Sequence, residues 1–237
     1  MYGELAEVYD FLVPEALLSP EGSAAALDGV LAGLPAGARV LDCACGTGTL
    51  AVGLALRGFA VTASDASPEM VARTRALAAE RGVPLAVATR AWADLGGDGF
   101  DAVLCVGNSL THAGGVAGRR TALDGMRRAT CGGGLLAITS RNWERPQAGG
   151  EEVVERGGRR ATVRRTWHGG DPRRLEIAVE LEGGGTHAEQ LSYWPFTHDE
   201  LDADLRAAGF EPEASTWSPE AERYLVTSRA NRSKTSR

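Results

Sequence analysis

The most constraining feature of this 237-residue chain is a short glycine turn that follows an apolar strand. Residues 39–42 are typical of a buried strand, and Gly46 and Gly48 then allow the backbone to turn sharply into a helix expected over 49–57. The next strand is followed directly by the carboxylate of Asp65. A glycine turn that opens a helix, with an acid at the end of the next strand, favours an adenosine-type cofactor, because that acid can accept hydrogen bonds from two ribose hydroxyls.

Strands and helices alternate through the first 140 residues. An amphipathic helical segment is expected over 2–34, with interruptions near Pro14 and Pro20. The elements expected after the glycine turn are strand 60–64, a helix opened by Ser67 and Pro68, strand 85–89, strand 101–106, helix 119–130 and strand 135–140. Repeated β-α-β units predict a parallel sheet with right-handed crossovers, so the expected fold is a Rossmann-like, doubly wound, mostly parallel seven-stranded sheet.

The pattern changes after residue 140. Four segments with alternating polarity (152–155, 161–167, 175–181 and 187–194) are separated by glycine-rich turns. They predict an inserted antiparallel lid over 141–195, between two parts of the cofactor domain at 1–140 and 196–228. The second part is expected to hold helix 199–208 and strands 211–216 and 222–227, and the polar residues 229–237 are expected to form a disordered tail.

Composition and charge exclude several other classes. The net charge of -6 argues against a nucleic-acid surface, although arginines concentrate over 156–174. Cys43 and Cys45 have C-x-C spacing with no second pair, so no metal site is expected, and all four cysteines are expected to be reduced. No apolar run reaches membrane-spanning length and the first residues lack a secretion signal, so we expect a cytoplasmic protein without a membrane partner.

Two cofactor classes fit the glycine turn. The spacing of Gly46, Gly48 and Ala51 matches the nicotinamide fingerprint, which alone is a weak signal. Asp42 stands directly before the turn, where it would repel a pyrophosphate. The segment 65–70 and the final pair of antiparallel-looking strands are typical of methyltransferases instead.

With these features the sequence resembles the class I S-adenosylmethionine-dependent methyltransferases, and within them the glycine (glycine/sarcosine) N-methyltransferase family. The blocks that carry the resemblance are 40–48, 58–67, 99–109 with His112, 133–138, 140–144 and 191–195. The resemblance implies S-adenosyl-L-methionine as cofactor and a small-molecule amine as methyl acceptor.

The cofactor residues expected from the turn and from this resemblance share one sheet edge and the segments that cover it. Gly46 and Gly48 should lie under the methionine part, Asp65 should hold the ribose, and Val106 should flank the cofactor through its carbonyl. The full expected set is Tyr2, Tyr9, Asp42, Ala44, Cys45, Gly46, Gly48, Asp65, Ala66, Met70, Ala91, Trp92, Val106 and His112.

Three residues are expected to act on the acceptor. The resemblance implies that Arg141 binds the carboxylate of an amino acid, which a guanidinium fork can grip through two hydrogen bonds. Asn108 ends another strand and could orient the amine or the carboxylate. Alternation sends Tyr193 and Trp194 to opposite lid faces, and Tyr193 is the aromatic expected to shield the sulfonium.

Two departures from the family leave the acceptor open. The family has an arginine for the cofactor carboxylate in the N-terminal segment and tyrosines in the early lid strands, but residues 9–21 contain no arginine and 151–182 no tyrosine. Glycine or sarcosine is therefore the leading acceptor, and a bulkier amine, such as an amino-sugar or peptide-like biosynthetic intermediate, is the alternative. A nicotinamide-dependent dehydrogenase and a non-catalytic cofactor-binding protein stay open as other classes, and a homo-oligomer is compatible with the sequence.

Overall fold

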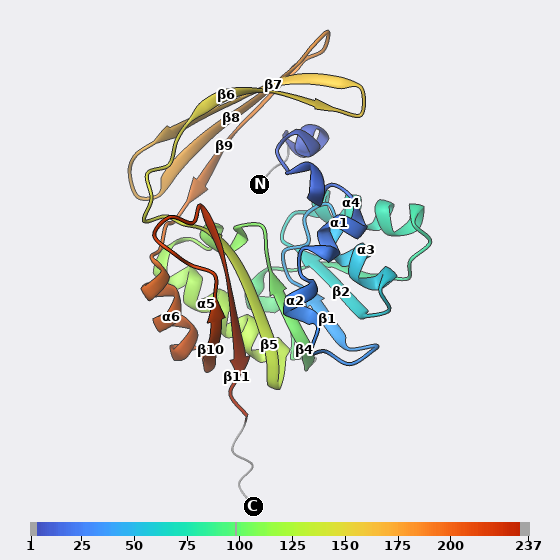
Figure 1. The fold of residues 1–237 in the computed structure, drawn as a ribbon, viewed down its shortest axis with the longest axis vertical. Coiled ribbons are helices and arrows are strands. Elements are labelled where there is room, and N and C mark those ends of the chain that lie inside the picture. Colours follow the sequence, from blue (N-terminus) through green and yellow to red (C-terminus); the bar gives the residue numbers. More distant parts are fainter. Residues whose placement is uncertain (1–3, 98, 233–237) are drawn as a thin grey trace, which may run out of the picture.

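The structure, a computed structural model, describes residues 4–97 and 99–232. Its main sheet has seven strands in the order β10-β11-β5-β4-β1-β2-β3. These strands are β1 (Arg39–Asp42), β2 (Ala60–Asp65), β3 (Ala86–Thr89), β4 (Phe100–Cys105), β5 (Thr130–Arg141), β10 (Phe210–Ser215) and β11 (Arg223–Ala230). The five strands from β5 to β3 pair in parallel, and β10 and β11 run antiparallel at one edge. The expected doubly wound, mostly parallel sheet is confirmed (Figure 1).

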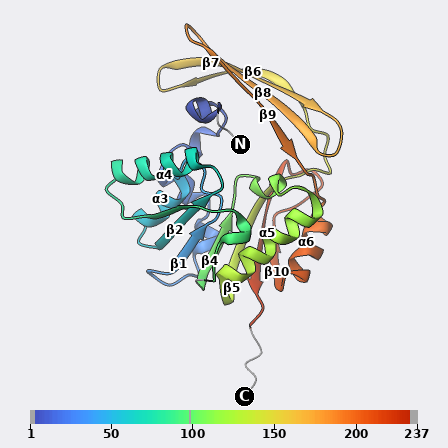
Figure 2. The same cartoon turned by 180° about the vertical axis from the view of Figure 1, so that it is seen from behind.

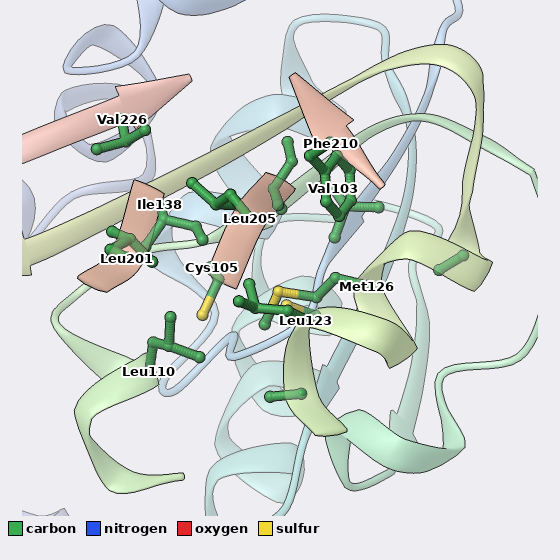
Figure 3. Packing of buried hydrophobic residues seen from close by; sticks show 14 of the residues in the cluster. Val103, Cys105, Leu110, Leu123, Met126, Ile138, Leu201, Leu205, Phe210 and Val226 are labelled. Atoms are coloured by element: carbon green, nitrogen blue, oxygen red, sulfur yellow. The ribbon is translucent and has the colours of Figure 1, made fainter. Parts of the chain in front are cut away.

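Helices cover both faces of this sheet (Figures 1 and 2). The helices are α1 (Pro20–Ala25), α2 (Asp28–Leu31), α3 (Thr49–Leu56), α4 (Pro68–Glu80), α5 (Gly115–Ala129) and α6 (His198–Ala207), with short 3-10 helices η1 (Ala6–Phe11), η2 (Glu15–Leu17), η3 (Trp92–Asp94) and η4 (Ser109–His112). Side chains alternate across β1, so Val40 packs in a cluster with Leu54 of α3, whereas Leu41 packs in a cluster with Leu123 of α5 and Leu201 of α6. Figure 3 shows the second cluster, in which Val103 and Ile138 lie against α5 and α6. Burial on both faces explains the continuous apolar run of β4.

A separate four-stranded antiparallel sheet is inserted between β5 and α6. Its strands are β6 (Gly150–Arg156), β7 (Arg159–His168), β8 (Arg173–Leu181) and β9 (Thr186–Tyr193), in sequential order. We call this sheet the lid. Leu5, Val8 and Phe11 of the N-terminal segment are buried against Val163 and Ile177 of the lid. The segment therefore lies between the lid and the main sheet, as Figures 1 and 2 show.

Local capping signals explain why several helix starts could be predicted. The Ser67 hydroxyl accepts a hydrogen bond from the Met70 N–H, and Pro68 occupies the first turn of α4. Thr197 forms a reciprocal capping box with Glu200 at the start of α6.

The described part of the N-terminal segment, residues 4–34, is helical with the expected interruptions near Pro14 and Pro20, and a further break near Leu27 divides it into four short helices. Pro20 opens α1, which Ser19 caps.

Three expectations need correction. Helix α5 begins at Gly115, four residues before the expected start, and β5 begins at Thr130, five residues early. Strand β11 reaches Ala230, inside the segment expected to be a disordered tail, because it pairs with β5 and β10. Residues 233–237 lie outside the described residues.

Candidate functional site

A cavity of about 990 Å³ lies at the carboxyl ends of β1, β2 and β4. Polar groups at these strand ends, such as Asp42 and Asp65, form its floor. The N-terminal segment contributes Tyr9 and Asp10, and the lid contributes Arg159. Ligands of open α/β sheets collect at this edge, so the cavity is the candidate functional site.

The glycine turn uses its two glycines for different purposes. Gly46 lines the cavity with a φ of +54°, and a Cβ added there would meet no atom within 4 Å. Gly48 has a φ of +89°, and a Cβ there would come within 2.8 Å of the Thr74 Cγ2 and 2.9 Å of the Thr74 Cα. Gly48 is not among the cavity-lining residues, so its absent side chain serves the packing of α3 against α4. Gly46 alone leaves space where a ligand could approach the turn.

Asp42 brings a buried acid to the cavity. Its Oδ1 accepts a hydrogen bond from the Ala44 N–H at 3.4 Å, and its buried Oδ2 has no partner among the described residues. The side chain is 1% exposed. Burial raises the pKa of Asp42 to about 7, with a smaller contribution from the nearby Asp65. A cationic ligand in the cavity would stabilise the ionised carboxylate.

Asp65 ties the ends of the first two strands together. Its Oδ2 accepts from the Gly46 N–H at 3.0 Å and its Oδ1 accepts from the Ser67 N–H at 2.9 Å. A carboxylate has about four lone-pair sites, so two remain for a ligand. Ala66 and Met70 continue the same wall of the cavity.

The segment after β3 supplies another wall. Ala91 and Trp92 both line the cavity. The Trp92 indole donates a hydrogen bond from Nε1 to the carbonyl oxygen of Cys43 at 3.0 Å. This bond fixes the indole against the glycine turn, where Ala44 and Cys45 also line the cavity.

Val106 and His112 line the cavity at the end of β4. The Val106 carbonyl accepts a hydrogen bond from the Ser109 hydroxyl at 2.7 Å. His112 Nδ1 lies 2.8 Å from the Ser192 carbonyl oxygen, which can only accept, so this nitrogen carries the proton. Burial lowers the pKa of His112 and favours the neutral imidazole.

Asn108 and Arg141, expected to bind the acceptor, and Tyr193, expected to shield the sulfonium, are not among the residues that line the cavity. The Asn108 Oδ1 accepts from the Arg141 N–H at 2.9 Å, so its carboxamide holds the end of β5. The Arg141 guanidinium donates to the Gln147 Oε1 at 3.1 Å and lies 5.9 Å from the centre of the Trp167 ring. Tyr193 is buried, with its ring 4.5 Å from that of His112. Their roles toward a substrate stay predictions.

Of the two N-terminal tyrosines expected at the cofactor site, only Tyr9 lies within the described residues. Tyr9 lines the cavity, and burial raises the pKa of its hydroxyl, with smaller contributions from Tyr193 and Asp65. Tyr2 lies outside the described residues. The structure therefore brings together at the cavity Tyr9, Asp42, Ala44, Cys45, Gly46, Asp65, Ala66, Met70, Ala91, Trp92, Val106 and His112.

Several cavity residues were not predicted from the sequence. Arg159 is the first residue of β7, directly after the turn of the first lid hairpin. Its guanidinium donates a hydrogen bond to the Asp10 carboxylate at 2.6 Å and lies 4.9 Å from the centre of the Phe11 ring. Arg223 and Tyr224 begin β11, and Arg90 follows β3. The sequence signal that could have indicated Arg159 and Arg90 as cavity residues is their position at the end of a predicted turn or strand. No local sequence feature indicates that Arg223 reaches the cavity.

Two features are absent from the described residues. Among residues 4–97 and 99–232, no helix is long and apolar enough to cross a membrane. The same part of the chain contains no group of three histidine, cysteine or acidic side chains that could hold a metal ion.

Comparisons with known proteins place this site in a family context. Residues 40–134 match a family described as "Methyltransferase domain". The chain is 40% identical over 121 residues to a glycine/sarcosine N-methyltransferase of Parasynechococcus marenigrum, a match that covers 49% of this chain and 43% of that protein. The chain thus spans less than half the length of this curated relative.

Solved structures agree over nearly the whole chain. SAM-bound CalS10, an amino pentose methyltransferase from Micromonospora echinaspora involved in calicheamicin biosynthesis, is 27% identical with a TM-score of 0.77 and 98% coverage of both chains. The CcbJ methyltransferase from Streptomyces caelestis has a TM-score of 0.80 at 24% identity, covering 97% of this chain and 98% of that one. This second likeness supports the fold alone.

Proposed function

We propose that this protein transfers a methyl group from S-adenosyl-L-methionine to the nitrogen of a small amine, because its residues 40–134 form a class I S-adenosylmethionine-dependent methyltransferase domain. The observation that carries the proposal is the coincidence of the cavity with the glycine turn, the buried Asp42 and the strand-end Asp65. Glycine or sarcosine is the first candidate acceptor, on the identity to the glycine/sarcosine N-methyltransferase.

The residues around the cavity fit this cofactor. The unpartnered Oδ2 of Asp42 is a ready acceptor for a positively charged group, and the open space over Gly46 leaves room for the methionine part. The remaining lone pairs of Asp65 can accept from two ribose hydroxyls, with Met70 and Trp92 forming apolar walls for the adenine.

S-adenosyl-L-methionine supplies a methyl group that is already electrophilic, so the main task of the protein is alignment. Holding nucleophile and methyl group in line can lower the barrier by about 7–11 kcal/mol. The acceptor nitrogen has to be uncharged, and loss of its proton to water on binding is sufficient. The N-terminal segment packs against the lid beside the cavity, and exclusion of water by these elements would favour the transfer.

A specific observation favours a second acceptor class. The structure of CalS10, an amino pentose methyltransferase, superposes on 98% of this chain, whereas the sequence match to the glycine/sarcosine N-methyltransferase covers 49%. An amine on a larger molecule, such as an amino sugar, is therefore the second candidate. The expectations of a cytoplasmic location, a homo-oligomer and no nucleic-acid partner stay predictions.

Formation of S-adenosylhomocysteine is the direct test of the proposed function. Purified protein should convert S-adenosyl-L-methionine when offered a panel of amines that includes glycine, sarcosine and amino sugars. Product masses raised by one methyl group per turnover would identify the acceptor class. No turnover with any amine, in protein that binds the cofactor, would contradict N-methyl transfer to a small amine.

Replacing Arg141 with lysine tests the predicted acceptor contact. Lysine keeps the charge but cannot form two parallel hydrogen bonds to an acid group, so the apparent KM for the acceptor should rise about tenfold or more. The affinity for S-adenosylhomocysteine should be unchanged. Equal losses in both quantities would show that Arg141 supports the fold of the site rather than the acceptor.

A further inference from the structure

Two arginines face each other at the end of the sheet nearest the cavity. Arg141 is the last residue of β5, and Arg223, the first residue of β11, is its direct partner in the antiparallel register. Direct cross-strand partners project from the same face of a sheet, and like charges in such pairs are destabilising. The pKa of the Arg141 guanidinium is lowered first by burial and then by the charge of Arg223. The sequence therefore retains a repulsive pair at this position.

Neither arginine forms an ion pair with a carboxylate of the described residues. Within the described residues, no carboxylate oxygen lies within 4.0 Å of a guanidinium nitrogen of Arg141 or Arg223, and the side-chain partner of Arg141 is the neutral Gln147. The carboxylate of Glu222 only partly offsets the effect on the pKa of Arg141.

Neighbouring arginines of the lid show the opposite arrangement. Arg165, whose charge also lowers the pKa of Arg141, is paired with Glu152 across β6 and β7. Arg164 is paired with Glu151 at 2.7 Å. These two lid arginines are therefore neutralised by carboxylates of the neighbouring strand, whereas the β5–β11 pair is not.

The position of Arg223 connects this charge to the cavity. Arg223 lines the cavity and is exposed, so it lies at the rim. Arg141 is half-buried behind it, beside Trp167 and within the electrostatic reach of Tyr193. A ligand that enters past Arg223 would meet the two guanidinium groups together.

We propose that Arg223 is a second anion-binding residue, and that the methyl acceptor carries an acid group, carboxylate or phosphate, held between Arg223 and Arg141. This inference rests on the proposed function and adds a specificity residue to it. An acid group placed there removes the repulsion of the pair and can use both guanidinium forks. An amine without such a group is bound poorly.

The test is a binding titration on protein saturated with S-adenosylhomocysteine. Glycine is the carboxylate probe and inorganic pyrophosphate is the phosphate probe, and calorimetry gives both affinities. Arg223→Gln should weaken the better-bound probe about tenfold or more, because a charge-assisted hydrogen bond is lost. Arg223→Lys should restore part of that affinity. The probe that wild-type protein binds more tightly identifies the acid group.

Arg229→Gln is the matched control. Arg229 lies on the same strand six residues away, is paired with Glu213 at 2.9 Å and is not among the cavity-lining residues. Arg229→Gln should leave both probe affinities unchanged.

Thermal unfolding gives an independent measurement. Arg223→Gln should unfold at no lower temperature than wild type in the absence of an anion, because the substitution removes the repulsion between Arg223 and Arg141.

The outcomes separate this inference from the proposed function. The inference is supported if all variants bind S-adenosylhomocysteine with equal affinity while probe binding is weakened in Arg223→Gln, partly restored in Arg223→Lys and unchanged in Arg229→Gln. Equal probe affinities in wild type and Arg223→Gln would overturn it, as would a wild-type complex that binds neither probe at millimolar concentration. Failure of wild-type protein to bind S-adenosylhomocysteine would instead contradict the proposed function.

Discussion

The strand ends at the cavity and the lid above them are specified in different ways. At the strand ends, hydrogen bonds to the backbone determine the geometry. Asp65 accepts hydrogen bonds from two backbone N–H groups, and Gly46 leaves the space over the turn open. In the lid, side chains decide the arrangement, because Leu5 and Phe11 of the N-terminal segment pack on apolar residues of a sheet whose other positions are charged. Asp65 and Gly46 are therefore restricted in residue type, whereas the apolar contacts of the lid can be made by other apolar side chains of similar volume.

The family match covers one of these two regions. The methyltransferase-domain match ends at residue 134, before the lid begins at Gly150. The lid and β11, both outside this match, supply Arg159 and Arg223 to the cavity. Residues of this kind can set the choice of acceptor on a fold that serves many functions.

Replacing Asp65 should have the largest effect. Asp65→Ala leaves the Gly46 and Ser67 N–H groups without their acceptor and removes the groups expected to hold the ribose. Loss of charge-assisted hydrogen bonds of about 1.5–3 kcal/mol each predicts a fall in S-adenosylhomocysteine affinity of about a hundredfold, measured by calorimetry. Asp65→Asn, which keeps one acceptor oxygen, should lose less. Unchanged affinity in Asp65→Ala would remove this carboxylate from the cofactor site.

The two glycines of the turn should respond differently to alanine. Gly48→Ala places a Cβ against the Thr74 backbone, so overpacking of about 1–3 kcal/mol adds to a left-handed backbone strain of about 1–2 kcal/mol. Gly46→Ala carries only the strain, because its Cβ enters open space. Urea unfolding should therefore rank Gly48→Ala as the less stable protein. The reverse ranking would mean that α3 and α4 can separate without cost.

The raised pKa of Asp42 predicts a pH dependence in two quantities. A folded-state pKa of about 7 lies above that of an unfolded aspartate, so the folded state holds more protons between about pH 4 and 7. The free energy of unfolding of the cofactor-free protein should then fall as pH rises through that window, with no further loss from this group above pH 7. A cationic cofactor prefers the ionised acid, so its affinity should increase from pH 6 toward pH 8, by up to about tenfold per pH unit below the pKa.

Asp42→Asn is the control for this dependence. The amide cannot ionise, so the same titration in this variant reports the protonation of the cofactor and of other groups alone. The difference between the two pH profiles isolates Asp42. Parallel profiles would show that the buried acid does not interact with the bound cofactor.

The smallest effect is expected for the contact between the lid and the N-terminal segment. Arg159→Gln removes the ion pair with Asp10 and the cation–π contact with Phe11. Both partners of the ion pair are partly exposed, so about 0.2–1 kcal/mol is expected, which changes cofactor dissociation rates only a few-fold in stopped-flow measurements. A loss as large as that of Asp65→Ala would show that the lid, rather than the strand ends, determines cofactor binding.

The same contrast decides how much could be predicted from the sequence. The glycine turn, the Ser67 cap and the strand-end acids are local signals, and the structure has them where the sequence places them. The prediction that Gly48 lies under the cofactor missed its packing against Thr74, because Thr74 is 26 residues away in the chain. Arg223 could not be predicted, since only the pairing of β11 with β5 brings it beside Arg141.

Titration of purified protein with S-adenosylhomocysteine and, separately, with NAD tests the identity of the ligand most directly. We predict saturable heat for S-adenosylhomocysteine at one site per chain, abolished by Asp65→Ala, and no heat for NAD. Saturation by NAD with no response to S-adenosylhomocysteine would contradict a methyltransferase cofactor site at the ends of β1 and β2.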